Sequence, residues 1–546
     1  MVSTDIFPAA SSPDAITQDA TVYIIGGGIA GLLVAQTLVA ASSAAKGAVP
    51  WRRIAIVERG ERLGMGLTQG NGRSLTATEG LVAAGMTPAA LDRALVTPLD
   101  QGGYAYPGFV PTAEDRTAMG NYAAGLRAIA ADIDNRDLSL VRFGLANLTQ
   151  WQAWAVQYPD LAAASGFYLN EKLRIYGGAQ AQTRAIAEIN RLNQAGPDCG
   201  WDKPGRLASY RDALAFDPAM EAYLAPRSSA AQQFEGALTL QPGGAIHVGR
   251  LVEKLTATLL ASGQVTLHTQ ARVKGIQWRS PGTGMERIIG GLLLEGDTPQ
   301  QLGTAQDHYV FATGFDGLLH QSGAIAAPLF PVAGTSITLQ LPASESSAAT
   351  GATGANAAST GFPQHAWKQD TLGPLVFSPT FDTVLNRWIL RVGGFKFYPG
   401  TGDAHPALDL NHPGARWAIH HQIHQAIAFL PDVVPQLLNG IIPPNRDPKG
   451  DWIAGNGSKR QELQDILNPW IGLRPLYADG MAALGPFATN GYAISGTGSW
   501  GLSSGIGNAA LISQWLQGRS LDQLRLTGIP TPWLRDYLER VDPLRF

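Results

Sequence analysis

Hydrophobic and polar positions in the N-terminal part of the chain predict one complete structural unit. Residues 21–38 (TVYIIGGGIAGLLVAQTL) form a short apolar run, a glycine turn and a longer apolar run. This pattern predicts a buried strand, a tight turn and a helix. Residues 52–57 (RRIAIV) form a second short apolar run that ends at Glu58. Together they predict a βαβ unit.

The stretch from about residue 100 to 240 has a different pattern, because its apolar positions follow helical spacing. It predicts three amphipathic helices, at residues 113–131, 145–158 and 183–194. No catalytic group of residues stands out in this stretch. We therefore expect helical cover for another domain, with loops that shape a substrate pocket.

Strand-like patterns return after residue 238. The pattern there predicts a turn, a helix at 247–262, and strands at 265–269 and around Val273. An apolar strand at 307–314 ends in Ala-Thr-Gly. Small residues at a strand end allow a cofactor to approach the edge of a sheet.

Two further segments predict a second, mostly antiparallel sheet. Residues 326–342 have a strand-like pattern, and residues 375–398 predict two or three antiparallel strands. Between them, residues 343–364 are low in complexity and predict a flexible excursion.

The C-terminal part contains a second strand, turn and helix. Residues 492–495 predict a strand, residues 496–508 (GTGSWGLSSGIGN) a glycine-rich turn, and residues 509–516 a helix. The start of this helix could point at an electron-rich ring. The chain then ends in polar helix and loop.

Composition and charge narrow the class of protein. With 546 residues the chain is too long for one core, so we expect two domains or one large domain with a second layer. Hydrophobic residues make up 45% and charged residues only 15%. The net charge of −3 gives no basic surface for a nucleic acid.

The cysteine content and the N-terminal residues indicate in which cellular compartment the protein is expected. The single Cys199 excludes an internal disulfide, a cysteine-based zinc site and a redox pair. We expect an ordinary loop cysteine, with a free thiol or a covalent flavin link as the alternatives. Residues 1–19 lack a secretory signal and predict a disordered leader. Residues 22–40 are apolar, but their glycines argue against a membrane span, so a soluble, cytoplasmic protein is expected.

Glycines 26, 28 and 31 follow the G-x-G-x-x-G spacing of a dinucleotide-binding unit. Gly26 allows the tight turn, Gly28 allows a pyrophosphate to approach, and Gly31 allows helix and strand to pack closely. Glu58 could accept hydrogen bonds from a ribose, although it follows Gly31 by 27 residues rather than the usual 20 or so. The motif alone leaves NAD, NADP and FAD open, and the alternative is a glycine-rich loop in an ordinary βα unit.

Two other segments carry candidate ligands. The polar loop after Glu58 places Thr68, Asn71, Arg73 and Ser74 where they could reach a phosphate or a flavin ring. The alternative for these residues is a surface loop. A predicted helix at 411–430 carries His420, His421 and His424. His420 and His424 share a face and could hold a metal, but we expect a solvated histidine face and no metal.

Several motifs, in this order along the chain, resemble the D-amino acid oxidase (DAO) family of FAD-dependent oxidoreductases, which includes glycine and sarcosine oxidases and D-amino acid dehydrogenases. The resemblance spans nearly the whole chain. It departs from the family in the long helical stretch at 100–240 and in the insertion at 343–364. Both lie where the family builds its substrate site, so they bear on substrate identity. The motifs are VYIIGGGIAG, GLTQGNGRSL, QPGGAIHVGRLVEKL, YVFATG, FPVAGTSITL, GLRPLYADGMAALGP and GTGSWGLSSGIGNAALISQWL.

The resemblance implies an α/β plus α+β fold, with a Rossmann-type FAD-binding domain and a second, antiparallel-sheet substrate domain that carries helical insertions. The implied FAD-binding domain comprises 20–100, 238–322 and 468–520. The implied substrate domain comprises 101–237 and 323–467, and a C-terminal tail follows at 521–546.

The resemblance also implies FAD as the cofactor. The ADP half would lie on the first glycine loop and Glu58, the flavin and pyrophosphate on the following loop, and the pyrimidine end on the second glycine turn. The implied cofactor-binding residues are Gly26, Gly28, Ile29, Ala30, Gly31, Glu58, Arg59, Leu67, Thr68, Asn71, Gly72, Arg73, Ser74, Val273, Thr313, Gly314, Gly498, Ser499, Trp500, Gly501 and Leu502.

The implied reaction is hydride transfer from the Cα of an amino acid or amine to flavin N5, which gives an imine that hydrolyses to an oxo acid and ammonia. Arg474 matches the family's carboxylate-binding arginine, and the alternative is a structural arginine that ties down a turn. Tyr398 could bind the carboxylate or pack in the core, and Trp500 could pack by the flavin or be structural. Lys396 and Arg391 are further candidates for the substrate carboxylate, or exposed sheet charges.

No general base is required if the amine enters unprotonated, and none is identified. The electron acceptor is left open as oxygen or another acceptor. No nucleic acid and no membrane span are expected. The alternative functions are oxidation of a 2-hydroxy acid or polyol phosphate, and a flavoprotein without redox turnover.

Overall fold

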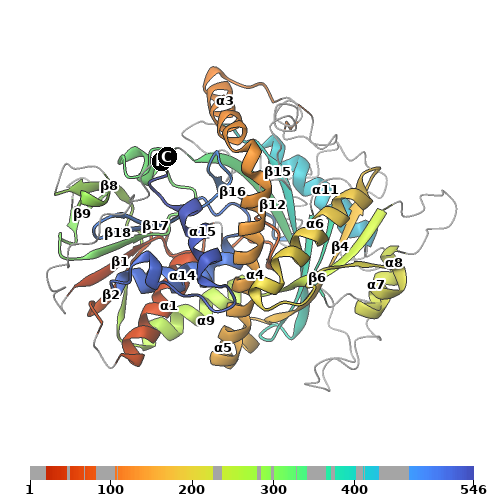
Figure 1. The fold of residues 1–546 in the computed structure, drawn as a ribbon, viewed down its shortest axis with the longest axis horizontal. Coiled ribbons are helices and arrows are strands. Elements are labelled where there is room, and N and C mark those ends of the chain that lie inside the picture. The colour runs from red at the N-terminus through yellow and green to blue at the C-terminus, as the bar shows by residue number, and fades with distance from the viewer. Residues whose placement is uncertain are drawn as a thin grey trace, which may run out of the picture.

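The computed structural model shows two large sheets with helices packed between and around them (Figure 1). Six strands form the sheet on the left of Figure 1, and nine strands form the sheet on the right. The expected α/β plus α+β fold is confirmed. The structure describes residues 20–45, 49–66, 68–80, 97, 105–106, 109–224, 236–279, 284–296, 300–327, 329–340, 365–370, 375–400, 410, 412–429 and 467–545.

The six-stranded sheet has the order β17-β18-β11-β1-β2-β7 and is parallel except for β17. The predicted βαβ unit is at its centre, with the helix α1 (Ile29–Ala44) between two neighbouring strands. Ile25 pairs with both Val57 and Phe311, so the ends of these strands meet at one edge. The strands are β1 (Thr21–Ile25), β2 (Arg53–Val57), β7 (Val265–His268), β11 (His308–Phe311), β17 (Ala483–Ala488) and β18 (Gly491–Ser495).

The nine-stranded sheet is mostly antiparallel, as predicted, with the order β16-β12-β15-β14-β13-β4-β6-β3 and β5 paired to β6. Among the described strands, the β4–β13 pair is parallel. The strands are β3 (Ser74–Thr76), β4 (Tyr168–Gly177), β5 (Arg206–Ala208), β6 (Gly236–Ala245), β12 (Phe330–Gln340), β13 (Trp367–Asp370), β14 (Leu375–Asp382), β15 (Arg387–Phe397) and β16 (Trp470–Leu476).

Two predictions about this sheet were wrong. The QPGG segment, predicted as a turn after residue 238, lies inside the ten-residue strand β6. β6 pairs with β4 along its whole length, and this pairing holds even Pro242 and the glycines in an extended conformation. β4 itself lies in the stretch predicted to be helical cover.

A smaller antiparallel sheet lies beside the six-stranded sheet. It consists of β8 (Val273–Trp278), β9 (Ile289–Leu294) and β10 (Gln301–Leu302). Val273 is buried in one apolar cluster with Ile25 and Val57, so this sheet packs against the ends of β1 and β2.

Of the three helices predicted in the long central stretch, the first ends earlier, at Ala128 rather than residue 131, and the other two are longer than predicted. The second begins at Ile133 rather than near residue 145, and the C-terminal helix begins at Gly501 rather than residue 509. The helices are α3 (Ala113–Ala128), α4 (Ile133–Gln157), α5 (Pro159–Ala164), α6 (Ala181–Ala195), α7 (Tyr210–Phe216), α8 (Glu221–Leu224), α9 (Val248–Ala261), α10 (Leu318–Gln321), α11 (Pro413–Phe429), α14 (Gly501–Leu516) and α15 (Thr531–Val541).

The end of the chain is part of the main core. α15 is amphipathic and buries Leu534, Tyr537, Leu538 and Val541. These side chains belong to the same apolar cluster as α1, α4 and α14. The C-terminal segment therefore supports the helices that lie over the six-stranded sheet.

Two minor expectations have definite outcomes. Cys199 is free and buried, and burial raises the pKa of its thiol to about 12. His420 is 4% exposed, so the expected solvated histidine face is wrong for this residue. The described residues contain no cluster of three possible metal ligands from His, Cys, Asp and Glu. The flexible excursion at 343–364 lies outside the described residues.

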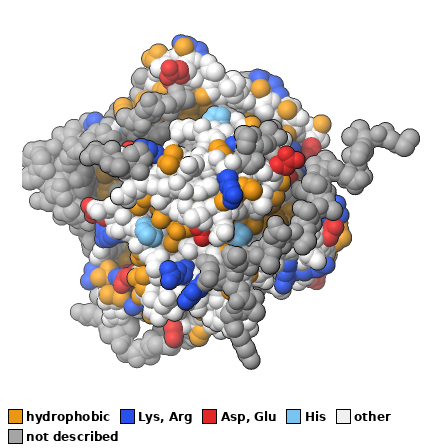
Figure 2. All heavy atoms as spheres, turned by 90° about the vertical axis from the view of Figure 1, so that its left-hand side faces the viewer, with side chains coloured by type: hydrophobic (Ala, Val, Ile, Leu, Met, Phe, Trp, Pro, Cys, Tyr) orange, Lys and Arg blue, Asp and Glu red, His pale blue; other side chains and the backbone are white. Residues whose placement is uncertain are grey.

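None of the described helices combines the length and the apolar character needed to cross a bilayer. On the face seen in Figure 2, acidic and basic side chains are interspersed among neutral ones. This view therefore shows no extended basic surface.

His247 is the N-cap of α9, and its titration is expected to lower the free energy of unfolding in acid. Its Nδ1 accepts a hydrogen bond from the Arg250 backbone N–H (3.2 Å). Burial and the nearby charge of Arg73 lower the pKa of His247 to about 3, although Asp382 opposes this shift. Because the unfolded pKa is about 6.5, the unfolded chain binds more protons between pH 6.5 and 3. His247 therefore stabilises the fold fully above pH 6.5 and progressively less on acidification, by up to about 1.4 kcal/mol per pH unit.

A His247→Asn variant tests this step, because asparagine keeps the cap but does not titrate. We expect the wild type to lose about 2 kcal/mol more unfolding free energy than the variant between pH 7 and pH 4.5, measured by urea unfolding. Equal losses in the two proteins would contradict the assignment.

Candidate active site

The first glycine loop lies at the shared edge of β1, β2 and β11. Gly26 has φ 109°, and a Cβ there would lie 2.3 Å from the carbonyl oxygen of Ala312. A Cβ at Gly31 would lie 2.1 Å from the carbonyl oxygen of Gly26. The predicted reasons for these two glycines, a tight turn and close packing of helix on strand, are therefore present in the structure.

Glu58 is held beside this loop. Its Oε2 accepts a hydrogen bond from the Gly27 N–H and its Oε1 from the Gly60 N–H, both at 2.8 Å. The neighbouring Arg59 forms an exposed ion pair with Asp316 at 3.3 Å. The structure therefore brings Glu58 next to the glycine loop and directs Arg59 toward β11 and the loop that follows it.

The N-terminus of α1 meets the polar loop. Gly28 is the N-cap of α1, and the N–H of Ile29 donates to Thr68 Oγ1 at 2.9 Å. Ala30 follows in the first turn and is partly exposed. Free N–H groups at this helix end form a site for an anion. Leu67, also predicted to lie here, is outside the described residues.

Thr313 and Gly314 follow β11 at the same edge. Thr313 Oγ1 is buried and has no hydrogen-bond partner in the described part of the chain. Gly314 has φ 62° and turns the chain away from the sheet. An orphaned buried hydroxyl beside the glycine loop is expected where a polar ligand binds.

The second glycine turn packs against the strand that follows the polar loop. Gly498 donates its N–H to the carbonyl oxygen of Pro475 at 2.7 Å. Trp500, the N-cap of α14, is buried and donates from Nε1 to the Thr76 carbonyl oxygen at 2.9 Å. Ser499 Oγ donates to the Glu79 carbonyl oxygen at 3.3 Å. Gly501 and Leu502 continue into the first turn of α14.

The nine-stranded sheet has one apolar and one polar face. Successive side chains of a strand point to opposite faces. On one face, Leu173, Trp367, Phe377 and Leu390 belong to an apolar cluster with α11. The residues that alternate with the apolar set form what we call the polar face. It carries Lys172, Arg174, Ser336, Thr338, Lys368, Ser378, Thr380, Arg391 and Arg474.

The polar loop is tied to this polar face. Ser336 Oγ donates to the Gly70 carbonyl oxygen (3.1 Å), and Ser378 Oγ donates to the Gly72 carbonyl oxygen (2.6 Å). Arg391 donates from Nη2 to the Gln69 carbonyl oxygen at 3.1 Å. The loop is therefore held by the sheet.

Arg73 points into the sheet. It has φ 59°, and the Asn71 side chain accepts a hydrogen bond from its N–H at 2.7 Å. Its guanidinium is buried and donates to Thr380 Oγ1 at 3.0 Å. Burial lowers the pKa of Arg73 to about 9. Its role toward a cofactor stays a prediction.

Sequence reasoning missed an ion cluster on the polar face. Lys368 Nζ lies 3.0 Å and Lys172 Nζ 3.5 Å from the two carboxylate oxygens of Glu79, and Lys172 also donates to Ser74 Oγ at 2.7 Å. Burial alone would raise the pKa of Glu79, but the two lysines hold it well below its usual range. Burial lowers the pKa of Lys172 to about 8, although Glu79 opposes this. No motif in the sequence joins these residues, because they come from three separate segments.

The predicted substrate residues occupy different environments. Arg474 is partly exposed and donates to the carbonyl oxygens of Ala333 (3.2 Å) and Gly394 (3.3 Å). Tyr398 is fully buried, stacks on Phe330, and its hydroxyl donates to Asp115 at 3.1 Å. The structure therefore places Tyr398 in a packed core, and its predicted contact with a substrate stays untested.

Arg391 and Lys396 come from the same strand but differ in setting. Arg391 is 3% exposed, bonds to Thr338, and has a buried Nε without a partner among the described residues. Burial lowers its pKa well below the usual value. It is therefore a buried cation rather than an exposed sheet charge. Lys396 lines a cavity beside the second glycine turn.

This cavity has a volume of about 60 Å³. Its polar side carries Glu79, Lys396, Thr497 and Ser499, and Trp500 lies at its wall. The structure therefore brings Ser499 and Trp500 together with Glu79 and Lys396, which no sequence motif links to them.

The family model described as "DAO: FAD dependent oxidoreductase" matches residues 21–515. The chain belongs to the DAO family of FAD-dependent oxidoreductases. No curated protein matches the chain in sequence.

Solved structures share the fold of this DAO-family chain at low sequence identity. Glycine oxidase from Geobacillus kaustophilus has a TM-score of 0.57 and 15% identity, over 96% of this chain and 99% of that one. L-proline dehydrogenase from P. horikoshii has a TM-score of 0.51 and 13% identity, over 97% and 100%. L-amino acid deaminase from Proteus vulgaris has a TM-score of 0.51 and 11% identity, over 98% and 99%.

FAD is the cofactor of the DAO family, and the residues present here fit it. Backbone atoms fill the space where a Cβ at Gly26 or Gly31 would lie, as a pyrophosphate-binding turn requires. The N-terminus of α1 supplies the anion-binding end, and Thr313 supplies an unpartnered buried hydroxyl. The residue-by-residue assignment of the FAD contacts stays a prediction.

Proposed function

We propose that this chain oxidises the C–N bond of an amino acid or related amine, with FAD as the cofactor. The observation that carries the proposal is the position of Arg474. It precedes Pro475, whose carbonyl oxygen holds Gly498 in the second glycine turn. An arginine on the polar face is thus adjacent in sequence to the residue that holds the turn predicted to face the flavin.

Arg474 would bind the substrate carboxylate. Its planar guanidinium can accept a carboxylate in a bidentate pair, which fixes both position and orientation. Because the carboxylate would be anchored by Arg474, the Cα–H bond of the substrate would be held in one orientation.

The cofactor supplies the redox chemistry when it is bound, because flavin N5 accepts a hydride from the substrate Cα. The chain positions the substrate and excludes water. Trp500 is 5% exposed and is fixed by its bond to Thr76, so it forms a rigid wall. The amine would enter unprotonated, so no residue is assigned as a general base. The imine then hydrolyses to the oxo acid and ammonia.

The names of proteins with this fold support a nitrogen-containing substrate, since they include a glycine oxidase, an L-proline dehydrogenase and L-amino acid deaminases. The electron acceptor would be oxygen or another oxidant. Oxidation of a 2-hydroxy acid or polyol phosphate, and an FAD protein without turnover, are the alternatives that the test separates.

The test is anaerobic bleaching of the enzyme-bound flavin by a panel of D- and L-amino acids, simple amines, 2-hydroxy acids and glycerol phosphate. We expect at least one amino acid or amine to bleach the flavin and the oxygen analogues to leave it oxidised. Bleaching by hydroxy acids or glycerol phosphate alone, or by no compound, would overturn the proposal.

A further inference from the structure

The cavity beside the second glycine turn has an apolar wall in addition to its polar lining residues. This wall is made by Tyr122 and Leu126 of α3, Leu140 of α4 and Tyr537 of α15. All four side chains are at most 4% exposed. The wall therefore comes from the long central helices and the C-terminal helix, which lie outside the glycine motifs.

Tyr537 is linked to the turn predicted to face the flavin by a chain of aromatic contacts. Its ring stacks on Phe143 with centroids 3.8 Å apart and an interplanar angle of 13°. Phe143 in turn meets Trp500 edge to face, with centroids 5.9 Å apart. These contacts fix the position of the Tyr537 ring in the lining of the cavity.

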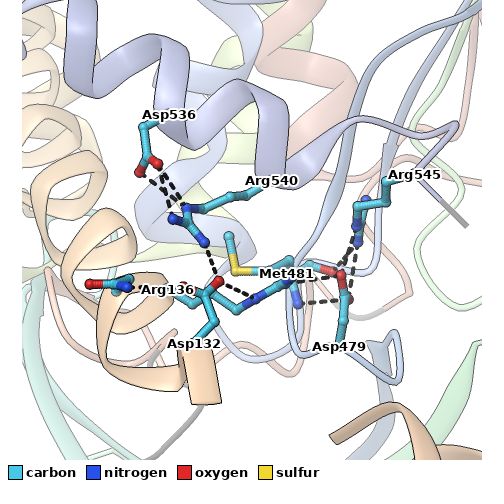
Figure 3. Close-up of polar contacts among 8 residues, drawn as sticks. Asp132, Arg136, Asp479, Met481, Asp536, Arg540 and Arg545 are labelled. Atoms are coloured by element: carbon cyan, nitrogen blue, oxygen red, sulfur yellow. Dashed lines mark hydrogen bonds and ion pairs between the residues drawn. The ribbon is translucent and has the colours of Figure 1, made fainter. Parts of the chain in front are cut away.

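The loop between β16 and β17, which closes the same cavity, is held by the C-terminal segment (Figure 3). Arg545 donates to both carboxylate oxygens of Asp479, at 2.7 and 3.1 Å, and to the Met481 carbonyl oxygen at 3.0 Å. Arg136 of α4 approaches the same carboxylate at 3.3 Å. We call this set of contacts the C-terminal clasp.

The clasp holds residues next to the lining of the cavity. Asp479 and Met481 flank Gly480, which lines the cavity, and Ala482 follows. Arg136 also pairs with Asp132 at 3.2 Å, and Asp132 forms a further ion pair with Arg540 of α15 (Figure 3). The position of Tyr537 and the position of this loop therefore depend on the same C-terminal residues.

We infer that the substrate carries an apolar side chain, which lies against this wall, and that Tyr537 limits its length. The inference rests on the proposed function. Arg474, two residues before the cavity-lining Leu476 on β16, receives the carboxylate, and the apolar wall receives the carbon chain. A charged side chain would lose its hydration against this wall without gaining a partner.

The test compares kcat/KM of the FAD-loaded wild type and variants for alanine, leucine, phenylalanine, aspartate and lysine, in the stereoisomer that bleaches the wild-type flavin. We expect the wild type to prefer apolar side chains over aspartate and lysine. Tyr537→Ala is expected to raise the phenylalanine-to-alanine ratio of kcat/KM by at least about tenfold. Arg545→Ala, which releases the clasp, is expected to shift the ratio in the same direction.

Arg535→Ala is the matched control, because Arg535 lies on α15 but forms exposed ion pairs with Asp522 and Glu539. Its ratio is expected to equal that of the wild type. Flavin absorbance confirms FAD loading in each variant, and Arg545→Ala decides the question if Tyr537→Ala does not fold. A wild-type preference for aspartate or lysine, or ratios unchanged in the folded variants, would overturn the inference while the proposed function stands. A wild type that oxidises no amino acid would instead overturn the proposed function.

Discussion

Replacing Arg474 by alanine is expected to leave FAD bound and to lower kcat/KM for carboxylated substrates by about 3 kcal/mol, which is roughly 150-fold. The reason is the loss of a charge-assisted, bidentate contact in a site that excludes water. Steady-state kinetics with the best amino acid substrate measure the effect, and the flavin absorbance measures cofactor content. Arg474→Lys is expected to recover only part of the loss, because an ammonium cannot form the planar pair.

An amine without a carboxylate is the control substrate for this variant. Its kcat/KM is expected to change by less than about threefold, because it makes no contact with Arg474. Unchanged kinetics on carboxylated substrates would remove Arg474 from the site. An equal loss on both kinds of substrate would show that Arg474 is structural.

Gly31→Ala is expected to weaken FAD binding by about 10- to 100-fold and to yield protein with little flavin. A Cβ at this position would lie 2.1 Å from the Gly26 carbonyl oxygen and 3.1 Å from the Ile24 side chain. α1 would have to move away from β1, and its N-terminus would move with it. Titration of the apoprotein with FAD, followed by flavin fluorescence, measures the dissociation constant.

Gly120→Ala is the matched control for this helix glycine. Gly120 lies within α3, and a Cβ there would meet nothing within 4 Å. Alanine also favours helix over glycine by up to about 1 kcal/mol, so this variant is expected to bind FAD normally and to be no less stable. Normal FAD affinity in Gly31→Ala would contradict the role given to the close approach of α1 and β1.

The glycine motifs were predictable because their signal is local. A strand, a glycine turn and a helix occur within a few residues at both Gly26 and Gly498, and both units are present in the structure. The second sheet was also predictable in type, because its strands alternate apolar and polar positions. What local patterns could not supply was the pairing of distant segments.

Strand β6 shows why some of the fold could not be predicted. The Pro-Gly-Gly sequence favours a turn, but pairing with β4 holds it extended, and a Cβ at Gly244 would lie 2.0 Å from the Tyr168 carbonyl oxygen. The glycine is required by a strand that is distant in sequence. Pairing with β4 therefore overrides the local preference of this segment for a turn.

The glycines of the candidate site could be predicted from the sequence, but most of its charged groups could not. Glu79, Lys172 and Lys368 come from three segments, and only the folded sheet brings them together. Tyr398 follows a strand of the expected sheet, yet its hydroxyl is directed to Asp115 in the core. The side on which such a residue lies depends on the packing of neighbouring helices, which periodicity alone does not fix.

The most direct test of the central claim is a single anaerobic turnover with the amino acid that bleaches the flavin fastest. The chain is proposed to oxidise a C–N bond, so each reduced FAD should be accompanied by one molecule of ammonia, or of primary amine from an N-alkylated substrate, and one of oxo acid. We predict this one-to-one ratio of nitrogen released to flavin reduced. Flavin reduction without release of ammonia or amine would contradict the account.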